Sequence, residues 1–279
     1  MKFYYINHMN EKIDFGDYPY LFQSGDLLDY TWNYDSDNNK ISNIRRELKK
    51  YKVKIAVMCD VSLPVEERRS EFGENVNRLV EGFEKDVLEN ENGRLYTDSG
   101  AYLSCMIMGS TKSDWNMGIP FMFNDLTLVA EYPAWVTETP YIFKVSDPVT
   151  TNNKKYAYRY AYRYANGLNN ATIVNDHFAP THFRLIFYGP CTNPHVIIGE
   201  HRYQVNILLE AGEYLTVDSR ARTVKKTMVN GTVVNAFHNR SFQDSVFKQI
   251  PPGTSTVSWP GTFDFDLTLL AERSEPEWT

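Results

Sequence analysis

The sequence predicts a mainly β protein with some α-helix, divided into an N-terminal mixed α/β part and a C-terminal β-sandwich. Three observations support this fold class. One apolar stripe with helical spacing lies in the first half of the chain. The second half consists of short β-like runs separated by turns that contain glycine and proline. A polar, turn-rich stretch at residues 146–154 separates the two patterns, so we expect domains at residues 1–145 and 146–279.

The apolar stripe of the first half predicts one long amphipathic helix. Its residues recur at helical spacing, so they share one face. Pro64 lies near the expected start, and Asn92-Gly93 follows the expected end. The stripe consists of Phe72, Val76, Leu79, Phe83 and Val87.

A shorter stripe precedes this helix and predicts one or two further helical turns. Lys49 and Lys50 lie near its end, where the helix dipole favours cations. The stripe consists of Ile41, Ile44, Leu48 and Tyr51.

The remainder of the first half predicts strands. Residues 51–59 alternate polar and apolar side chains, as a half-buried strand does. Residues 94–97 and 101–108 flank an Asp-Ser-Gly turn and predict a hairpin. The run at residues 121–132 alternates but changes phase at Asn124-Asp125, so we expect a β-bulge there.

The second half predicts a series of short strands. Asn230-Gly231 is its strongest hairpin signal, because both residue types tolerate a positive φ. The expected strands are His182–Tyr188, His195–Ile198, Arg202–Leu209, Tyr214–Asp218, Thr223–Val229, Thr232–Phe237 and Phe263–Ala271.

Five tyrosines alternate with alanine and arginine between Tyr156 and Tyr164. A strand with this period places all five rings on one face. Such a face can stack sugars or bases. A core or interface face whose hydroxyl groups reach water is the structural alternative, and it is the one we favour because tyrosine suits half-buried surfaces.

Charge and composition exclude several functions. Residues 1–140 carry 15 Lys and Arg against 23 Asp and Glu, a net charge of −8, whereas residues 141–279 carry a net charge of +2. Specific nucleic-acid binding is not expected, because phosphate contacts need concentrated Lys and Arg. The N-terminus lacks an apolar signal-peptide core and no window reaches the ~18 apolar residues of a membrane span, so we expect cytoplasmic synthesis and no membrane insertion.

The residues that could carry chemistry point to no enzyme. No phosphate-binding glycine loop and no nucleophile motif is present, so we expect no catalytic residue and no cofactor. Cys59, Cys105 and Cys191 are odd in number and far apart, which is typical of reduced core cysteines.

Two weaker patterns contain residue types that form metal or catalytic sites in other proteins. His177 and His182 lack the further ligands of a zinc site, so we expect packed or solvated histidines and no metal. The carboxylate pairs Glu210/Glu213 and Asp264/Asp266 are adjacent in sequence, whereas glycoside hydrolysis needs two carboxylates facing each other across a cleft. Solvated turn and edge charges are the expected role of both pairs.

Several phrases along the chain together resemble the distal tail proteins of long-tailed bacteriophages and their prophages. The resemblance covers essentially the whole chain, although each phrase alone is a turn motif. The phrases are Asp14-Phe-Gly-Asp-Tyr-Pro-Tyr-Leu, the helix at Leu63–Glu91, Leu185-Ile-Phe-Tyr-Gly-Pro-Cys-Thr-Asn-Pro, Gly212-Glu-Tyr-Leu-Thr-Val-Asp, Asn235-Ala-Phe, Phe247-Lys-Gln-Ile-Pro-Pro-Gly and Arg273-Ser-Glu-Pro-Glu-Trp.

This resemblance implies a structural protein of the virion tail tip, or baseplate. The N-terminal domain would form a ring, expected to be a homo-hexamer, and the C-terminal domain would be a galectin-like β-sandwich. The ring would join the tail tube to the baseplate hub, so the implied partners are the tail tube protein, the tape-measure protein, the tail hub with its tail-associated lysin, and a receptor-binding protein. The family supplies no catalytic residues.

A second function remains open from the sequence. A galectin-like sandwich could bind carbohydrate and contribute to recognition of the host cell surface, with Trp259 and the tyrosine row stacking on a sugar ring. The sandwich carries no long insertion, whereas relatives of this kind that bind cell-wall sugar have an extra carbohydrate module. We therefore expect another protein to bind the receptor.

Overall fold

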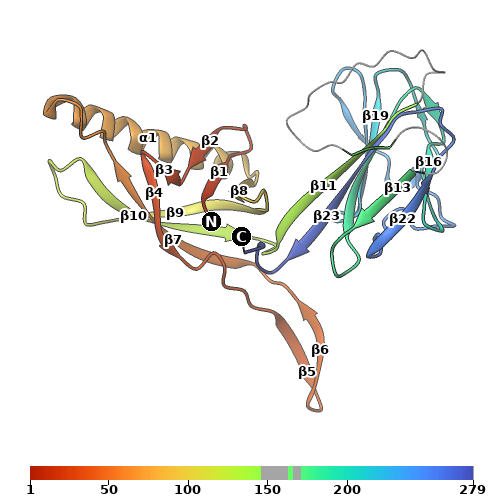
Figure 1. Cartoon of the computed structure of the whole chain (residues 1–279), viewed down its shortest axis with the longest axis horizontal. Coiled ribbons are helices and arrows are strands. Elements are labelled where there is room, and N and C mark those ends of the chain that lie inside the picture. The colour runs from red at the N-terminus through yellow and green to blue at the C-terminus, as the bar shows by residue number, and fades with distance from the viewer. Residues whose placement is uncertain (146–162, 166–170, 279) are drawn as a thin grey trace. The chain divides into compact units, whose positions relative to one another are not determined.

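The computed structural model describes residues 1–145, 163–165 and 171–278 (Figure 1). Within these residues the protein is mainly β, with one α-helix. The chain forms two compact units. Unit 1 comprises Met1–Val136 and Arg273–Thr279, and unit 2 comprises Thr137–Glu272.

Unit 1 contains the helix and most of the long strands. A long strand, β9, joins its two groups of strands: its first part pairs with β8 and its second part with β10. The elements are β1 Phe3–Ile6, β2 Lys12–Asp14, β3 Gly16–Asp17, β4 Tyr20–Gly25, β5 Asn33–Asp37, β6 Lys40–Arg45, β7 Lys49–Met58, α1 Val65–Glu89, β8 Gly93–Thr97, β9 Tyr102–Ser113 and β10 Phe121–Ala130.

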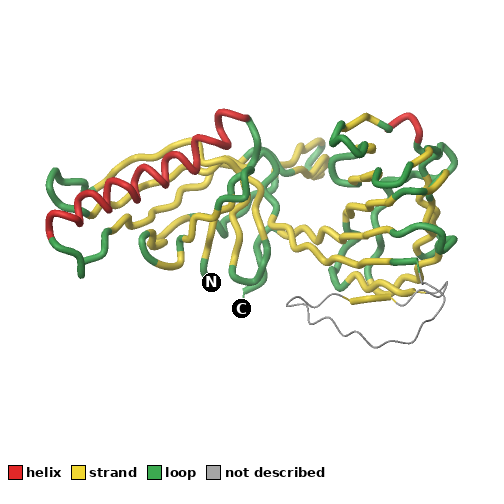
Figure 2. The backbone as a smooth tube through the Cα atoms, turned by 90° about the horizontal axis from the view of Figure 1, so that it is seen from above, coloured by secondary structure: helices red, strands yellow, loops and turns green. Residues whose placement is uncertain are grey.

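The antiparallel sheet of unit 1 follows the order β9, β10, β7, β4 and β3. A second group, β2, β1 and β8, continues from β9. Helix α1 lies along the strands, where it contacts β9 and β7 (Figure 2). The apolar core of unit 1 lies between α1 and these strands.

Helix α1 is confirmed close to its expected bounds. Glu66 and Glu67 lie in its first turn, where the helix dipole favours carboxylates. Asn90 ends the helix in the left-handed conformation, and Glu91 N–H donates to the Asp86 carbonyl at 3.0 Å. Four residues of the predicted stripe pack into or against the core, whereas Val87 is 38% exposed.

Unit 2 contains two sheets that enclose one hydrophobic core. One sheet has the order β21, β20, β19, β14, β23 and β11, and the other has the order β13, β22, β16 and β17. The strands are β11 Trp135–Phe143, which begins in unit 1, β12 Arg163–Ala165, β13 Ala171–Asn175, β14 His182–Tyr188, β15 Cys191–Thr192, β16 His195–Ile198, β17 His201–Gln204, β18 Leu208–Leu209, β19 Tyr214–Asp218, β20 Thr223–Thr227, β21 Val233–Asn235, β22 Gly253–Ser258 and β23 Phe265–Arg273, with a short 3-10 helix η1 at Phe237–Asn239.

Aromatic side chains dominate the core of unit 2. Phe265 is fully buried and stacks on Phe143, with ring centres 4.4 Å apart. Trp259 meets the same two rings edge-on and is 6% exposed. Tyr141 also belongs to this core, so β11 supplies unit 2 with two aromatic side chains that precede residue 146.

Most strand predictions are confirmed. β14, β16 and β19 have the expected bounds, and β7 begins two residues before its predicted start. The hairpin of β8 and β9 turns at Gly100, whose φ is +87°. The run expected at Arg202–Leu209 is instead divided into β17 and β18.

The helical turns predicted from Ile41 to Tyr51 are wrong. Residues 40–45 form β6, which pairs with β5, and residues 49–51 begin β7. Asn38 and Asn39 both adopt a positive φ, which makes the two-residue turn that suits a β-hairpin. The pairing also shifts register between Asn33 and Asp35, and one extra residue lets a strand carry apolar side chains at a spacing of three, as a helix does.

The bulge predicted at Asn124-Asp125 is in a different place. β10 alternates buried and half-buried residues without interruption, and Asn124 is buried. The register shift lies at Thr127/Leu128, where Met108 of β9 is the extra residue. Asn124 looked like a polar break in the apolar alternation, but its side-chain oxygen accepts a hydrogen bond from the Ser110 hydroxyl at 2.8 Å.

The Asn230-Gly231 turn joins β20 and β21, as predicted. Gly231 N–H donates to Met228 O, and Met228 N–H donates to Thr232 O, both at 2.9 Å. Among the described residues of the turn, Gly231 alone has a positive φ, so the loop is a three-residue turn with a glycine bulge and not the two-residue type.

Two further features of the sequence analysis remain predictions. The tyrosine row lies at residues 156–164, of which 156–162 are outside the described residues. The division into independently folding domains at residues 145 and 146 also stays a prediction. The packing divides the chain at Val136 and Thr137, and it returns the chain to unit 1 at Arg273.

Candidate assembly surface

A two-stranded ribbon, formed by β5 and β6, extends away from the rest of unit 1 (Figure 1). Among the described strands the two pair with each other alone. An isolated two-stranded hairpin is marginally stable in water. The ribbon therefore gains stability if another surface covers it.

The ribbon and the segments that flank it expose several large apolar side chains. Contiguous apolar exposure of this kind marks an interaction surface. We call residues 30–48 the ribbon surface. Its exposed apolar members, with their exposed fractions, are Tyr30 (53%), Trp32 (42%), Tyr34 (57%), Ile41 (63%), Ile44 (62%) and Leu48 (55%).

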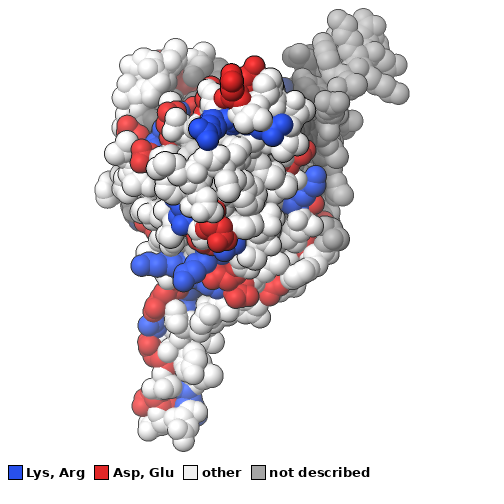
Figure 3. Space-filling model, turned by 90° about the vertical axis from the view of Figure 1, so that its left-hand side faces the viewer, with Lys and Arg blue, Asp and Glu red and all other residues white. Residues whose placement is uncertain are grey.

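Charges of both signs accompany these apolar residues, and Figure 3 shows acidic and basic side chains along the projecting ribbon. Arg45 bridges Asp35 at 3.0 Å and Glu47 at 2.8 Å. Hydrogen bonds from Asn43 and Arg45 hold the pKa of Asp35 below its usual value. A surface on which Arg45 pairs with two carboxylates and aliphatic and aromatic groups are exposed suits contact with protein.

Arg46 attaches the base of the ribbon to the rest of unit 1. Its guanidinium group lies over the Trp32 ring at 4.4 Å and over the Tyr132 ring at 5.6 Å. The same group donates to the Ser274 hydroxyl at 3.3 Å. The base of the ribbon is thus fixed, although its strands stand apart.

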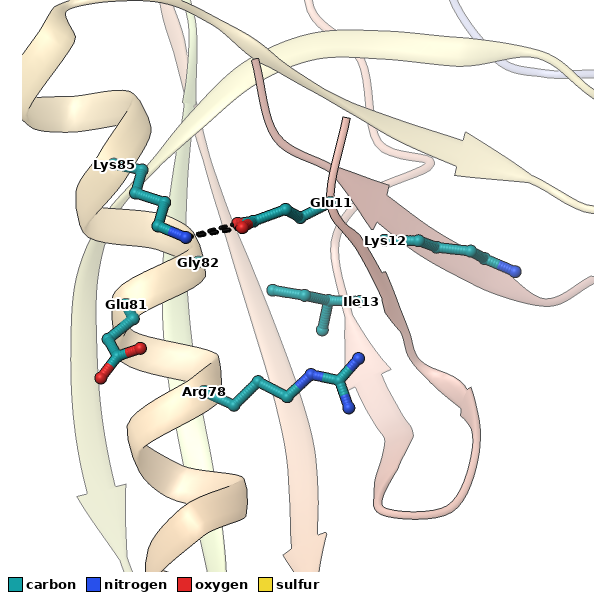
Figure 4. A pocket seen from close by; sticks show the side chains of 7 residues that line it. All are labelled: Glu11, Lys12, Ile13, Arg78, Glu81, Gly82 and Lys85. Atoms are coloured by element: carbon teal, nitrogen blue, oxygen red, sulfur yellow. Dashed lines mark hydrogen bonds and ion pairs between the residues drawn. The ribbon is translucent and has the colours of Figure 1, made fainter. Parts of the chain in front are cut away.

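A cavity of about 370 Å³ lies between α1 and β2 in unit 1 (Figure 4). Glu11 and Glu81 both line it, so it could be considered as a two-carboxylate site. Lys85 contacts the Glu11 carboxylate at 2.6 and 2.8 Å and lowers its pKa, whereas a general acid needs a raised pKa. Glu81 points away from Glu11 (Figure 4). The pair therefore lacks the arrangement of a glycosidase.

The carboxylate pair Glu210/Glu213 has a structural role that differs from the solvated one expected. Glu213 is 5% exposed and accepts the Glu210 backbone N–H at 2.7 Å and the Lys226 ammonium group at 2.6 Å. These two donors hold the pKa of Glu213 below its usual value. Glu213 thus ties the turn before β19 to β20.

The pair Asp264/Asp266 is likewise occupied within unit 2. Asp264 accepts the Val145 backbone N–H at 2.7 Å, and Asp266 accepts the Tyr188 hydroxyl at 2.7 Å. Burial raises the pKa of Asp266, and donation from Tyr188 opposes this shift. Both acids thus bind neighbouring chain.

The two histidines weighed as metal ligands make separate contacts. His177 Nδ1 lies 3.2 Å from Ala179 O, whereas His182 contacts the Ser219 hydroxyl and the Gln249 amide. Within the described ranges, no group of three or more His, Cys, Asp or Glu side chains is placed to hold a metal ion.

The cysteines are free, as predicted. Cys59 and Cys105 are buried, and burial raises the pKa of the Cys105 thiol to about 12, far from that of a reactive thiolate. Cys191 is half-buried.

Trp259, one of the two features behind the carbohydrate alternative, is in the core of unit 2. It cannot stack on a sugar in this packing. No helix in the described part of the chain is long and apolar enough to cross a membrane.

The sequence missed the ribbon surface. The Asn38-Asn39 pair was the available signal, because asparagine tolerates the left-handed conformation that a tight hairpin turn requires. The helix-like spacing of Ile41 and Ile44 obscured it.

The sequence matches no family model and no curated protein. Solved structures, in contrast, match almost the whole chain. The SPP1 Dit (gp 19.1) protein, presented as a paradigm of the hub adsorption apparatus in phages that infect Gram-positive bacteria, matches with a TM-score of 0.56 at 11% identity, over 97% of this chain and 99% of that chain.

Two chains of the phage P2 baseplate in its activated conformation, one with Ca and one with Sr, each match with a TM-score of 0.60. Their identities are 13% and 12%, over 99% of both chains in each case. The resemblance to distal tail proteins is therefore confirmed at the level of the fold.

Proposed function

We propose that this protein is a non-enzymatic structural subunit of a phage tail tip, a distal tail protein of the baseplate, made in the cytoplasm of the host bacterium. The observation that carries the proposal is the whole-chain likeness to the SPP1 Dit protein and to phage P2 baseplate chains. A likeness that spans both units supports a common architecture better than a likeness of one domain would, because one domain fold serves many functions.

In this proposal unit 1 forms a closed ring, most simply a homo-hexamer. The ribbon surface supports a protein contact, because its apolar side chains and its lone pair of strands need a cover. If each ribbon lies on a different surface of the next copy, the contact is head-to-tail, and such contacts must close into a ring or grow into a fibre.

The charge of the first half is compatible with DNA passing through the ring. Residues 1–140 have a net charge of −8, and a negative surface does not retain phosphate groups. The ring would connect the tail tube protein and the tape-measure protein to the tail hub, its lysin and a receptor-binding protein. Unit 2 would be the galectin-like domain outside the ring.

The test is the oligomeric state of the purified full-length protein, alone and mixed with the neighbouring tail proteins. Light scattering and negative-stain microscopy should reveal a six-fold ring in at least one of these conditions. A two-fold dimer in every condition would overturn the proposal, because a self-complementary pair cannot build a six-fold collar through that interface alone.

A further inference from the structure

A groove crosses the outer face of β20 and β21 in unit 2 and continues beside the loop at residues 240–247. It consists of two adjoining hollows of about 320 and 350 Å³, which share Arg222 and Phe237. Val224 and Ala236 of the same hairpin are buried in the core. Side chains alternate along a strand, so the neighbours of these two residues face the other way. Those neighbours, Thr223 and Lys225 on β20 and Asn235 on β21, line the groove.

Three cations line this groove: Arg222, Lys225 and Arg240. None of them forms an ion pair with a carboxylate in the described part of the chain. One carboxylate, Asp244, lines the wider hollow. The groove therefore offers an excess of positive charge to a ligand.

Arg240 is held in place by its surroundings. Its guanidinium carbon lies 3.9 Å from the Phe237 ring centre and 5.2 Å from that of Phe242. Its Nη1 donates to the Phe237 carbonyl at 2.7 Å. A stacked guanidinium group keeps N–H groups at its edge for bidentate contact with a carboxylate, and its fixed position lowers the entropic cost of binding.

Apolar groups accompany the cations. Phe242 is 80% exposed and Val233 is 56% exposed. Arginine beside exposed aromatic rings is the composition of the residues that carry most binding energy in protein interfaces.

The groove borders a sheet edge that no described strand covers, because β21 is the last of the described strands in its sheet. Thr232 O accepts the Met228 N–H just after β20, and Ala236 N–H donates to Val224 O of β20. Backbone groups of an antiparallel strand alternate between its two sides, so those of Val233 and Asn235 point away from β20. An edge of this kind can pair with an added strand.

We propose that this edge and groove bind an extended acidic segment of another protein, which adds to β21 as a further strand. Its carboxylates would meet Arg222, Lys225 and Arg240, and its apolar side chains would pack on Phe242 and Val233. The free backbone groups favour a polypeptide over an anionic glycan, since a glycan cannot continue the ladder. This site lies in unit 2 and does not depend on the ring.

The probes are two fluorescein-labelled peptides of equal length, one alternating Glu with Val and Phe and the other with Lys in place of Glu. Fluorescence anisotropy with the full-length protein should show binding of the acidic peptide at least tenfold tighter than that of the basic one, and weaker at higher salt. A labelled galacturonate oligomer serves as the anionic glycan.

Variants locate the binding site. Val233→Pro removes an outward N–H but keeps the bonds to β20, so it should weaken peptide binding at least tenfold. Val229→Pro is the control, because proline suits the second position of this turn. Phe242→Ala and Arg240→Glu should also weaken binding about tenfold, whereas Phe178→Ala, which changes an equally exposed ring elsewhere in unit 2, should not.

Unfolding midpoints within a few degrees of wild type would show that the variants fold. The proposal is overturned if the acidic peptide does not bind, if both peptides bind equally, or if the glycan binds and the acidic peptide does not. It is also overturned if Val233→Pro and Val229→Pro bind the acidic peptide alike.

Discussion

A β-hairpin of unit 1 and a β-hairpin of unit 2 differ in how much of each packs against the rest of its unit. In unit 2 the β20–β21 hairpin is paired to β19, buries Val224 and Ala236 in the core, and is tied down by the Glu213–Lys226 ion pair. In unit 1 no further described strand pairs with the β5–β6 ribbon, which exposes Ile41 and Ile44. Both hairpins turn at asparagine-containing loops, so the local turn chemistry does not set the difference. The difference lies in how far the rest of each unit packs on the strands.

The contrast distinguishes buried surfaces, which stabilise the fold, from an exposed apolar surface, which is available for association. Unit 2 encloses an aromatic core between two sheets, whereas unit 1 keeps a core under α1 and also carries an apolar surface outside that core. We therefore expect core changes to act on folding, and changes on the ribbon to act on association.

The largest effect should come from where a unit 2 fragment begins. A fragment of residues 137–272 keeps Tyr141 and Phe143, whereas a fragment of residues 146–279 lacks both. Loss of a buried aromatic side chain costs about 3–5 kcal/mol, and a domain is stable by only about 5–15 kcal/mol. The division predicted from the sequence at residues 145 and 146 and the division seen in the packing at residue 137 give opposite expectations for the second fragment. From the packing, circular dichroism with urea should show cooperative unfolding of the first fragment and not of the second. Equal stability would show that β11 is dispensable for unit 2.

The next effect concerns a buried polar cluster of unit 1. Asp86 on α1 is fully buried and accepts hydrogen bonds from the Tyr5 hydroxyl at 2.5 Å and from the His8 backbone N–H at 2.8 Å, with His8 Nδ1 at 2.6 Å. Asp86→Ala should destabilise the protein by about 1–3 kcal/mol for each buried donor left without a partner.

Urea unfolding of the full-length protein measures this loss. Glu84→Ala removes an exposed carboxylate from the same helix and should change the free energy of unfolding by less than about 0.5 kcal/mol. Similar losses for the two variants would contradict the account of unit 1.

The smallest effect is a pH dependence of the Glu213–Lys226 ion pair, which lies near the turn of the β20–β21 hairpin. The pKa of Glu213 is lowered in the folded protein, so its stabilising contribution is complete above the ordinary glutamate pKa and is lost as the pH falls through the lowered value. Glu213→Gln should therefore be less stable than wild type at neutral pH, and the two should converge as the medium is acidified. Unfolding curves at a series of pH values from neutral to about 3 test this, and a constant difference would contradict it.

The contribution of Asp266 to the stability of unit 2 should depend on pH in the opposite direction. Burial raises its folded pKa, so its contribution is complete below the ordinary aspartate pKa and is lost as the pH rises through the raised value. The free energy of unfolding of Asp266→Asn, relative to that of wild type, should be highest at neutral pH and lowest in acid. The two carboxylates thus serve as controls for each other.

Periodic patterns predicted the elements whose faces point to a core. Phe72, Val76, Leu79 and Phe83 predicted α1, and alternation predicted β7 and β14, because burial of one face fixes the period. The ribbon lacks that constraint. Its apolar residues face outward, so their spacing follows the bulge in the ribbon and not the period of a buried face.

Local sequence patterns predict the structural roles of polar residues least well. Asn124 reads as a break in a strand, although its side-chain oxygen accepts a hydrogen bond from the Ser110 hydroxyl within the sheet. The sequence predicts Glu213 as a solvated turn charge, although Lys226 of β20 pairs with it. Partners distant in sequence decide such cases, and a local pattern does not contain them.

The ribbon is the most direct test of the account, because its apolar surface is assigned to association and not to folding. Ile41→Glu/Ile44→Glu should abolish the ring, under conditions where the wild-type protein forms one, and leave the unfolding midpoint within a few degrees of wild type. Leu88→Glu, which alters an 81% exposed apolar residue of α1, should leave the ring intact. Light scattering with negative-stain microscopy gives the measurement. A folded Ile41→Glu/Ile44→Glu protein that still assembles rings as the wild type does would contradict the account.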